Sequence, residues 1–134
     1  SPDDDGIPAT SAQLSRPWGI AGDLLGNIYF SDSIFCTVRY ITPTQEIQTL
    51  LGIRGMCQGG DTAYLNGPRG LFCDVLASKL YIADRLNYVV KSYDLGAHTI
   101  EIVLGSGASG SAFSVDPLQV NPRTACVWLI FPVN

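Results

Sequence analysis

Apolar positions along this chain come in short runs and do not follow the period of a helix. Runs of about five to seven residues, rich in β-branched and aromatic side chains, alternate with turn sequences such as Leu25-Gly26-Asn27. No segment sustains an apolar period near 3.6 residues, so we expect no helix. The pattern predicts strands at 18–24, 27–32, 37–42, 46–51, 69–75, 79–84, 88–94 and 99–104.

The four strands of the first half are repeated by the four of the second half. Matched positions keep their order and are separated by 51 to 53 residues. The pairs, first unit before second, are Leu14/Leu65, Pro17/Pro68, Gly19/Gly70, Asp23/Asp74, Ile28/Leu80, Tyr29/Tyr81, Asp32/Asp84, Val38/Val90, Arg39/Lys91, Ile47/Ile100, Leu51/Leu104 and Gly52/Gly105. Four short strands in each unit of roughly 50 residues are typical of β-propeller blades. A third unit is expected to begin at 121–123.

The first strand of each unit carries two further expectations. Gly19 and Gly70 fit a crowded inner strand, where backbones approach each other closely. Residues 19–21 and 70–72 are nearly all apolar, which is typical of a strand that is covered on both faces.

These units resemble NHL repeats, whose blades follow the pattern P-x-G-[IL]-A-x-D-x-x-G-N-[IL]-Y-[VIF]-[AS]-D and then N-H-x-[VI]-x-K. Residues 17–32 match this pattern, and residues 68–87 match it in part. Segment 6–14 is similar to the G-G-P-A-T-x-A-Q-L linker of longer NHL repeats, and the resemblance covers residues 5 to 107. The Asn-His pair of the family is replaced by Phe35-Cys36 in the first unit.

The resemblance implies an all-β fold of β-propeller blades, each a four-stranded antiparallel sheet. NHL propellers close with about six blades, so it also implies an incomplete propeller within this chain. We expect an N-terminal linker segment at 1–13, a first NHL blade at 14–55, an inter-blade linker at 56–64 and a second blade at 65–107. Residues 108–134 would form a linker with a partial third blade, or a C-terminal extension.

Open edges of an incomplete propeller are unpaired strands that favour association. We therefore expect protein partners: further blades, identical copies or other subunits. A trimer of two-blade chains and a head-to-tail filament are two such arrangements.

Composition narrows the class of protein. The chain has 134 residues, of which 46% are hydrophobic and only 15% charged, which suits one folded domain and excludes intrinsic disorder. So little charge predicts that part of the surface is covered by other protein.

The net charge is −4 and the basic residues are scattered, so we expect no nucleic acid partner. The uncharged C-terminal run, 124–134, is too short to span a membrane. The chain begins with Ser1 and no leader follows, so we expect a processed chain or a piece of a longer one.

Four cysteines are candidates for disulfides: Cys36, Cys57, Cys73 and Cys126. They allow two bridges in three connectivities, and the alternative is four small buried apolar residues. None has the C-x-x-C spacing of zinc or redox sites. The cysteines and the low charge favour an extracellular or cell-surface location.

Candidate catalytic residues are scarce. His98 is the only histidine and falls in a turn, where we expect it to be solvated. The repeated aspartates, Asp23 and Asp32 with their counterparts, are expected to accept backbone hydrogen bonds in turns, with calcium binding as the alternative. We assign no catalytic, cofactor-binding or metal-binding residue. Tyr29 and Tyr81 are expected to pack between blades.

One pair of positions is a candidate for binding. Trp18 and Arg69 are equivalent positions directly after the proline that begins each unit. In a propeller they would lie near one rim, and both residue types are enriched at binding hot spots. We expect a rim contact with a partner there.

The sequence thus favours a non-catalytic module for protein–protein interaction or structural assembly. The first alternative is a fragment of an NHL-like propeller enzyme, a lyase or a hydrolase, whose catalytic residues lie mostly outside this chain. The second is an RNA-binding NHL domain, which the acidic net charge disfavours.

Overall fold

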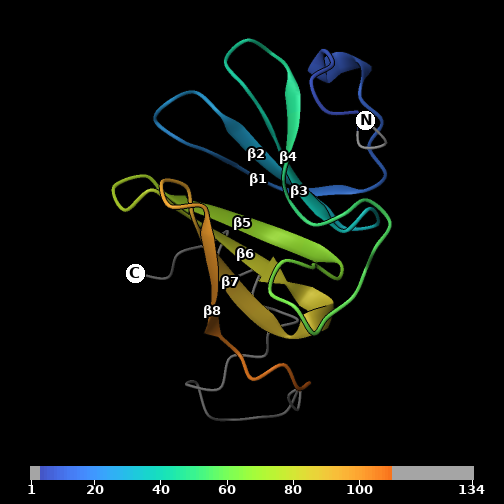
Figure 1. Cartoon of the computed structure of the whole chain (residues 1–134), viewed down its shortest axis with the longest axis vertical. Coiled ribbons are helices and arrows are strands. Elements are labelled where there is room, and N and C mark those ends of the chain that lie inside the picture. Colours follow the sequence, from blue (N-terminus) through green and yellow to red (C-terminus); the bar gives the residue numbers. More distant parts are fainter. Residues whose placement is uncertain (1–3, 110–134) are drawn as a thin grey trace.

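The computed structural model describes residues 4–109, which form two four-stranded antiparallel sheets (Figure 1). The first sheet, blade 1, contains β1 (Pro17–Gly22), β2 (Ile28–Asp32), β3 (Thr37–Ile41) and β4 (Ile47–Leu51). The second, blade 2, contains β5 (Pro68–Asp74), β6 (Lys79–Asp84), β7 (Val89–Asp94) and β8 (Thr99–Leu104). Each sheet follows the order of the sequence, as propeller blades do. The fold is all-β, an incomplete propeller within the described residues.

The predicted strands are confirmed, with ends that shift by two residues at most. The largest shift is in β1, which ends at Gly22 because the chain turns at Asp23. Two short 3-10 turns, η1 (Ala9–Ser11) and η2 (Arg85–Asn87), are the helical elements of the described part. No helix within residues 4–109 has the length and apolar character needed to cross a membrane. The expected third unit at 121–123 lies outside the described residues.

The two blades also share their irregularities. The register of β1 on β2 shifts between Pro17 and Ile20, and that of β5 on β6 shifts between Pro68 and Leu71. A second shift occurs after Val38 in β3 and after its counterpart Val90 in β7. Bulges are built into the sequence of a strand. Their recurrence therefore supports the internal repeat at the level of the backbone.

The main core lies between the two sheets. Blade 1 contributes Tyr29, Val38 and Leu51, all buried. Blade 2 and the chain before it contribute the buried residues Leu65, Leu71, Leu80, Ile82 and Tyr93. Tyr29 is thus confirmed as a contact between blades.

Tyr81 does not have the role expected of it. Side chains alternate between the faces of a strand, and its neighbours Leu80 and Ile82 point to blade 1. Tyr81 therefore faces away from blade 1 and packs against Ala83 and Val90 in a second, smaller cluster.

Backbone meets backbone where β1 and β5 adjoin. A Cβ atom on Gly19 would lie 2.3 Å from the Arg69 carbonyl oxygen and 2.9 Å from the Leu71 nitrogen. The Ser31 hydroxyl accepts a hydrogen bond from the Gly19 N–H and donates one to the Arg69 carbonyl. The expectation that Gly19 occupies a crowded inner strand is confirmed.

The expectation that the first strand of each unit is covered on both faces is wrong for β1, and in β5 it fails at Phe72, which is 40% exposed. Ile20 is exposed, whereas its counterpart Leu71 is buried. The described part of the chain contains one sheet on each side of the shared core, so blade 1 has a neighbour on one face only.

The N-terminal segment lies along the outer strand of blade 1, beside β4 in Figure 1. The Gly6 N–H donates to the Ile47 carbonyl at 2.8 Å, and the Ile47 N–H donates to the Ile7 carbonyl at 3.1 Å. Asp5 adds an ion pair with Arg39 at 3.1 Å. This pairing protects a strand edge that would otherwise be open.

Candidate functional site

The two candidate rim residues touch each other. The Arg69 guanidinium carbon lies 4.1 Å from the centre of the Trp18 ring, a cation–π contact between β1 and β5. Trp18 remains 47% exposed, and the Arg69 Nε atom makes no hydrogen bond within the described residues. The sequence predicts that both residues lie at one rim, but not that they stack on each other.

An apolar groove lies beside this pair on blade 1. Its volume is about 270 Å³. We name the side chains that form it the blade 1 outer face: Leu14, Trp18, Ile20, Ile28, Phe30, Ile41 and Ile47. Cross-strand partners point to the same face of a sheet, and Ile20 pairs with Phe30 while Ile28 pairs with Ile41. The groove can accept an apolar surface. The sequence did not predict this groove, because its apolar pattern indicated that β1 is covered on both faces.

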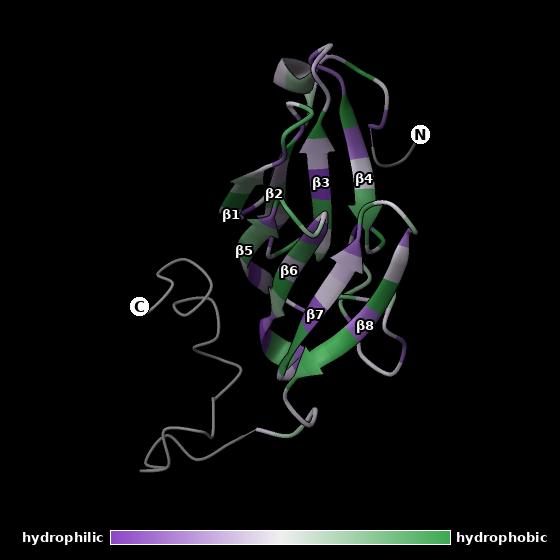
Figure 2. Ribbon diagram, turned by 90° about the vertical axis from the view of Figure 1, so that its left-hand side faces the viewer, coloured by the Kyte–Doolittle hydropathy of each residue, from purple (hydrophilic) through white to green (hydrophobic). Residues whose placement is uncertain are grey.

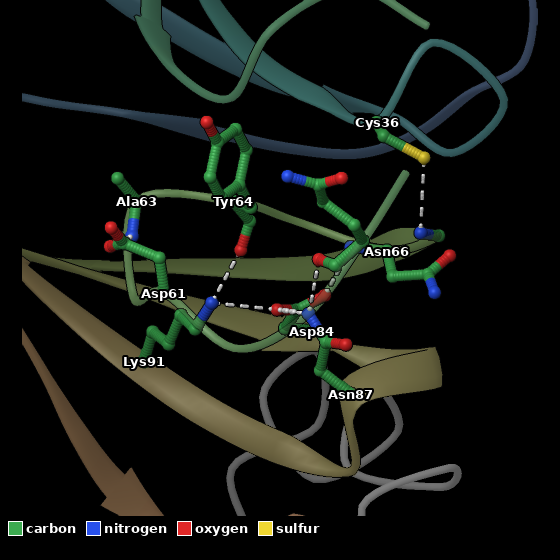
Figure 3. A network of polar contacts seen from close by, with 10 residues as sticks. Cys36, Asp61, Ala63, Tyr64, Asn66, Asp84, Asn87 and Lys91 are labelled. Carbon is green, nitrogen blue, oxygen red and sulfur yellow. Dashed lines mark hydrogen bonds and ion pairs between the residues drawn. The ribbon is translucent and has the colours of Figure 1, made fainter. Parts of the chain in front are cut away.

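Asp84 is the centre of a buried polar network (Figure 3). The Lys91 ammonium lies 2.8 Å from its Oδ2 atom and donates to the Tyr64 carbonyl at 2.6 Å. The Asn66 N–H donates to Oδ1 and the Asn87 amide to Oδ2, both at 2.7 Å. The network ties β6 and β7 to the chain that leads into β5.

The other repeated aspartates also bind backbone groups. Asp32 is fully buried and accepts hydrogen bonds from the N–H groups of Ser15, Arg16, Ile34 and Phe35. The structural interpretation of these residues is supported. Within residues 4–109, no group of three His, Cys, Asp or Glu side chains could hold a metal ion.

Asp23 organises the turn between β1 and β2. It accepts hydrogen bonds from the Leu25 and Asn27 N–H groups, the Asn27 amide and the Tyr29 hydroxyl, at 2.8–2.9 Å. Burial raises the pKa of Asp23, but these hydrogen bonds outweigh it and hold the pKa below its usual value. The pKa of Tyr29 is raised, first by burial and then by the hydrogen bond to Asp23.

A second groove, of about 360 Å³, lies beside η2 and the loop at 59–62. Its charged lining residues are Asp61 and Lys91, and Lys91 is already paired with Asp84. Asp61 accepts a hydrogen bond from the Ala63 N–H in its own turn. The groove therefore offers little charge for a ligand.

Two of the candidate cysteines form a disulfide, Cys36–Cys57. Cys36 is buried, and its sulfur also accepts a hydrogen bond from the Gly67 N–H at 3.4 Å. Cys73 is a free thiol whose pKa is raised, mainly by burial and then by the charges of Asp23 and Asp74. Cys126 lies outside the described residues.

His98 lies in the β7–β8 turn, as predicted, and is exposed. It is not simply solvated, because its Nδ1 atom lies 3.3 Å from the Tyr93 hydroxyl. Asp94 fixes the same turn, accepting from the Ala97 and Gly96 N–H groups, and these hydrogen bonds lower its pKa.

Comparison with known proteins shows relatives in structure but none in sequence. No family model and no curated protein matches the chain. A solved structure titled as a structural genomics protein of unknown function from Bacteroides thetaiotaomicron VPI-5482 is similar, with 25% identity and a TM-score of 0.53 over 64% of this chain. Streptogramin B lyase is similar at 17% identity and a TM-score of 0.46, also over 64% of this chain.

The length of these matches matters. The match covers 23% of the first solved chain and 25% of the second, so this protein spans about a quarter of each. The likeness to the first solved structure supports the fold described above, which in that protein is part of a longer chain. The resemblance to NHL repeats stays a prediction from the sequence.

Proposed function

We propose that this chain is a non-catalytic module for protein–protein interaction or structural assembly, built of two NHL-type blades, and that the exposed apolar residues of the blade 1 outer face bind other protein. The observation that carries the proposal is the difference in exposure between equivalent positions of the two blades. Ile20 is 71% exposed where Leu71 is 4% exposed, and Ile28 is 41% exposed where Leu80 is fully buried. Leu14, exposed, corresponds to Leu65, buried.

The second member of each pair is buried by the neighbouring blade. The first member has the same apolar character and no such cover within the described residues. Burying a single Ile or Leu side chain stabilises a complex by about 1.5–3 kcal/mol. Phe30 and Ile47 of the blade 1 outer face are buried within the chain, whereas Leu14, Trp18, Ile20 and Ile28 are exposed. An exposed apolar patch of this kind is typical of an interaction site.

The polar chemistry of the described residues agrees with a binding role. Asp84 and Lys91 neutralise each other, and Asp32 is saturated by backbone N–H groups. The Cys36–Cys57 disulfide supports an extracellular or cell-surface location, where such bridges persist.

A photoreactive benzophenone amino acid in place of Ile20 tests the proposal in the producing cell. We expect protein adducts at this position after irradiation, because the probe sits in the open groove. The matched control carries the same probe at Leu76, which is exposed at the tip of the β5–β6 hairpin and away from the groove. Equal adducts at both positions would count against a specific surface.

A further inference from the structure

We infer that β8 binds an extended peptide of a partner protein, which joins blade 2 as a fifth strand and places an apolar side chain in the groove beside η2. This site lies on blade 2 and is separate from the blade 1 outer face. β8 is the outermost strand of its sheet, and Ile102, Val103 and Leu104 on it are 50%, 45% and 39% exposed. Figure 2 shows β4 and β8 on the same side of the two sheets, with hydrophobic colouring along much of β8. Blades of a propeller stack through their faces, so a further blade would leave this edge open.

Blade 1 shows how such an edge is filled. Its outermost strand, β4, is paired with the N-terminal segment through the two hydrogen bonds between Ile47 and residues 6–7. From the same segment, the Asp5 carboxylate accepts a hydrogen bond from the Thr49 hydroxyl at 2.9 Å and forms its ion pair with Arg39. One extended segment thus satisfies the strand edge and the polar side chains beside it.

The equivalent backbone groups of blade 2 point outward. Ile47 pairs with Ile41 in blade 1, and its counterpart Ile100 pairs with Tyr93 in the same register. The N–H and carbonyl of Ile100 therefore point away from β7, as do those of Ile102 two residues later. In the described part of the chain, neither residue makes a backbone hydrogen bond on that outer side. β8 therefore offers donors and acceptors to an added strand.

The linker before blade 2 does not fill this edge. Cys57 and Gln58 are the counterparts of the two residues that pair with β4 in blade 1. Cys57 is instead bound to Cys36, and the Gln58 carbonyl accepts a hydrogen bond from the Asn87 amide at 3.0 Å. These two contacts hold the linker beside η2, so it forms one wall of the groove and leaves β8 unpaired.

The groove of about 360 Å³ adjoins the open edge. Ile102 of β8 lines it together with Val89 and Lys91 of β7. Ile102 and Lys91 are cross-strand partners, so their side chains share one face of the sheet. Alternate side chains of a strand added to β8 would point to this face and enter the groove. Recognition by strand addition combines these two elements, because backbone hydrogen bonds give affinity and pockets for alternate side chains give specificity.

The lining of the groove decides which side chain fits. In blade 1, Arg39 and Thr49 bind Asp5. Their counterparts in blade 2 are Lys91 and Ile102. The charge of Lys91 is already neutralised within blade 2, and Ile102 has no hydroxyl to donate. A carboxylate in this groove would lack partners, whereas an apolar side chain would cover Ile102. The partner strand therefore carries an apolar residue where the N-terminal segment has Asp5.

Peptide titration of the 134-residue chain, followed by NMR, tests this inference. The probes are two capped synthetic peptides, one with the sequence of residues 4–9 and one with the same sequence and Asp5→Leu. We expect the Leu peptide to bind about tenfold more tightly, because it buries an apolar side chain in place of an unpaired charge. The bound peptide should slow hydrogen exchange at the Ile100 and Ile102 amides and shift the signals of Val89.

Three variants locate the binding. Ile100→Pro removes an outward N–H and no hydrogen bond to β7, so it should weaken binding of the Leu peptide about tenfold. Ile102→Thr restores the hydroxyl that blade 1 has and should narrow the preference for the Leu peptide. Glu101→Ala changes a side chain on the opposite face of β8, so this control should bind like the unmodified chain. Circular dichroism and formation of the Cys36–Cys57 bridge show that each variant folds.

Slow exchange at the Ile100 and Ile102 amides without any peptide would overturn the inference, because another part of this chain or a second copy would then fill the edge. Failure of the Leu peptide to bind, equal binding of the two peptides, or full binding by Ile100→Pro would overturn it as well. None of these measurements involves the blade 1 outer face, so a failure here is distinct from a failure of the cross-linking test at Ile20.

Discussion

Single carboxylates hold the turns and loops of both blades. Asp32 and Asp84 are fully buried and saturated, and Asp23 accepts hydrogen bonds from Leu25 and Asn27 of its own turn and from the Tyr29 hydroxyl of β2. A carboxylate that accepts several hydrogen bonds strongly favours its charged form. These carboxylates hold the turns and loops beside the strands in place and so help to position the strands themselves.

Replacing Asp23 by Asn should lower the free energy of unfolding at neutral pH by about 1–2 kcal/mol, because a charged acceptor is lost. The folded-state pKa of Asp23 is depressed, so its contribution is present above the unfolded pKa of about 3.9 and is lost as pH falls through the folded value. Urea unfolding from neutral to acidic pH should therefore show the variant and the unmodified protein converging in acid. Asp61→Asn, in an exposed turn, is the control and should cost less. A difference that does not change with pH would contradict this role.

The repeat predicts that these aspartates are structural, but it does not predict every partner. Arg39 and Lys91 are equivalent positions, yet Lys91 binds Asp84 of its own blade while Arg39 binds Asp5 of the N-terminal segment. The ion pair between Arg39 and Asp5 depends on the path of the N-terminal segment, which lies outside the repeat, so no local sequence pattern predicts it.

Strands in this fold are encoded locally, while the links between them are not. Runs of β-branched and aromatic residues give the strands, and turn residues give their ends. The Cys36–Cys57 bridge depends on how the chain leaves β4 and returns to β5, so spacing alone leaves its pairing open. The bridge fixes the linker against the β2–β3 turn.

Removing this bridge with Cys36→Ala and Cys57→Ser should lower the free energy of unfolding by about 3 kcal/mol, because the unfolded chain regains the freedom of the closed loop. Urea unfolding under non-reducing conditions measures the change. Cys73→Ala leaves the bridge intact and is the control, with a smaller loss expected. An unchanged midpoint in the double variant would show that the bridge does not contribute.

At the scale of the molecule, the blades are joined by the core and by the backbone contact at Gly19. The sequence predicts this close approach, since glycine recurs at the start of both units. The sequence does not predict which apolar faces are exposed to solvent, because the exposure of a face depends on whether a neighbouring blade covers it and not on the sequence of the blade itself. Ile20 illustrates the difference: its residue type fits a covered strand, and its surroundings do not cover it.

Gly19→Ala should therefore push the blades apart. The new methyl group would meet backbone atoms of Arg69 and Leu71 that cannot turn aside, at a cost of about 1–3 kcal/mol in the free energy of unfolding. Gly22→Ala on the same strand is the matched control, because its nearest neighbour would be the Asn27 carbonyl oxygen at an ordinary 3.6 Å. Chemical denaturation of both variants measures the difference, and equal stabilities would refute the close approach.

The pairing of Gly6 and Ile7 with Ile47 has a consequence for biosynthesis. Gly6 and Ile7 precede the strand that binds them by about forty residues, so the edge of blade 1 is completed only after β4 has been made. Contacts so distant in sequence form slowly compared with hairpin closure. A nascent chain halted before β4 would leave residues 6–7 unbound, because the strand that pairs with them would not yet have been made.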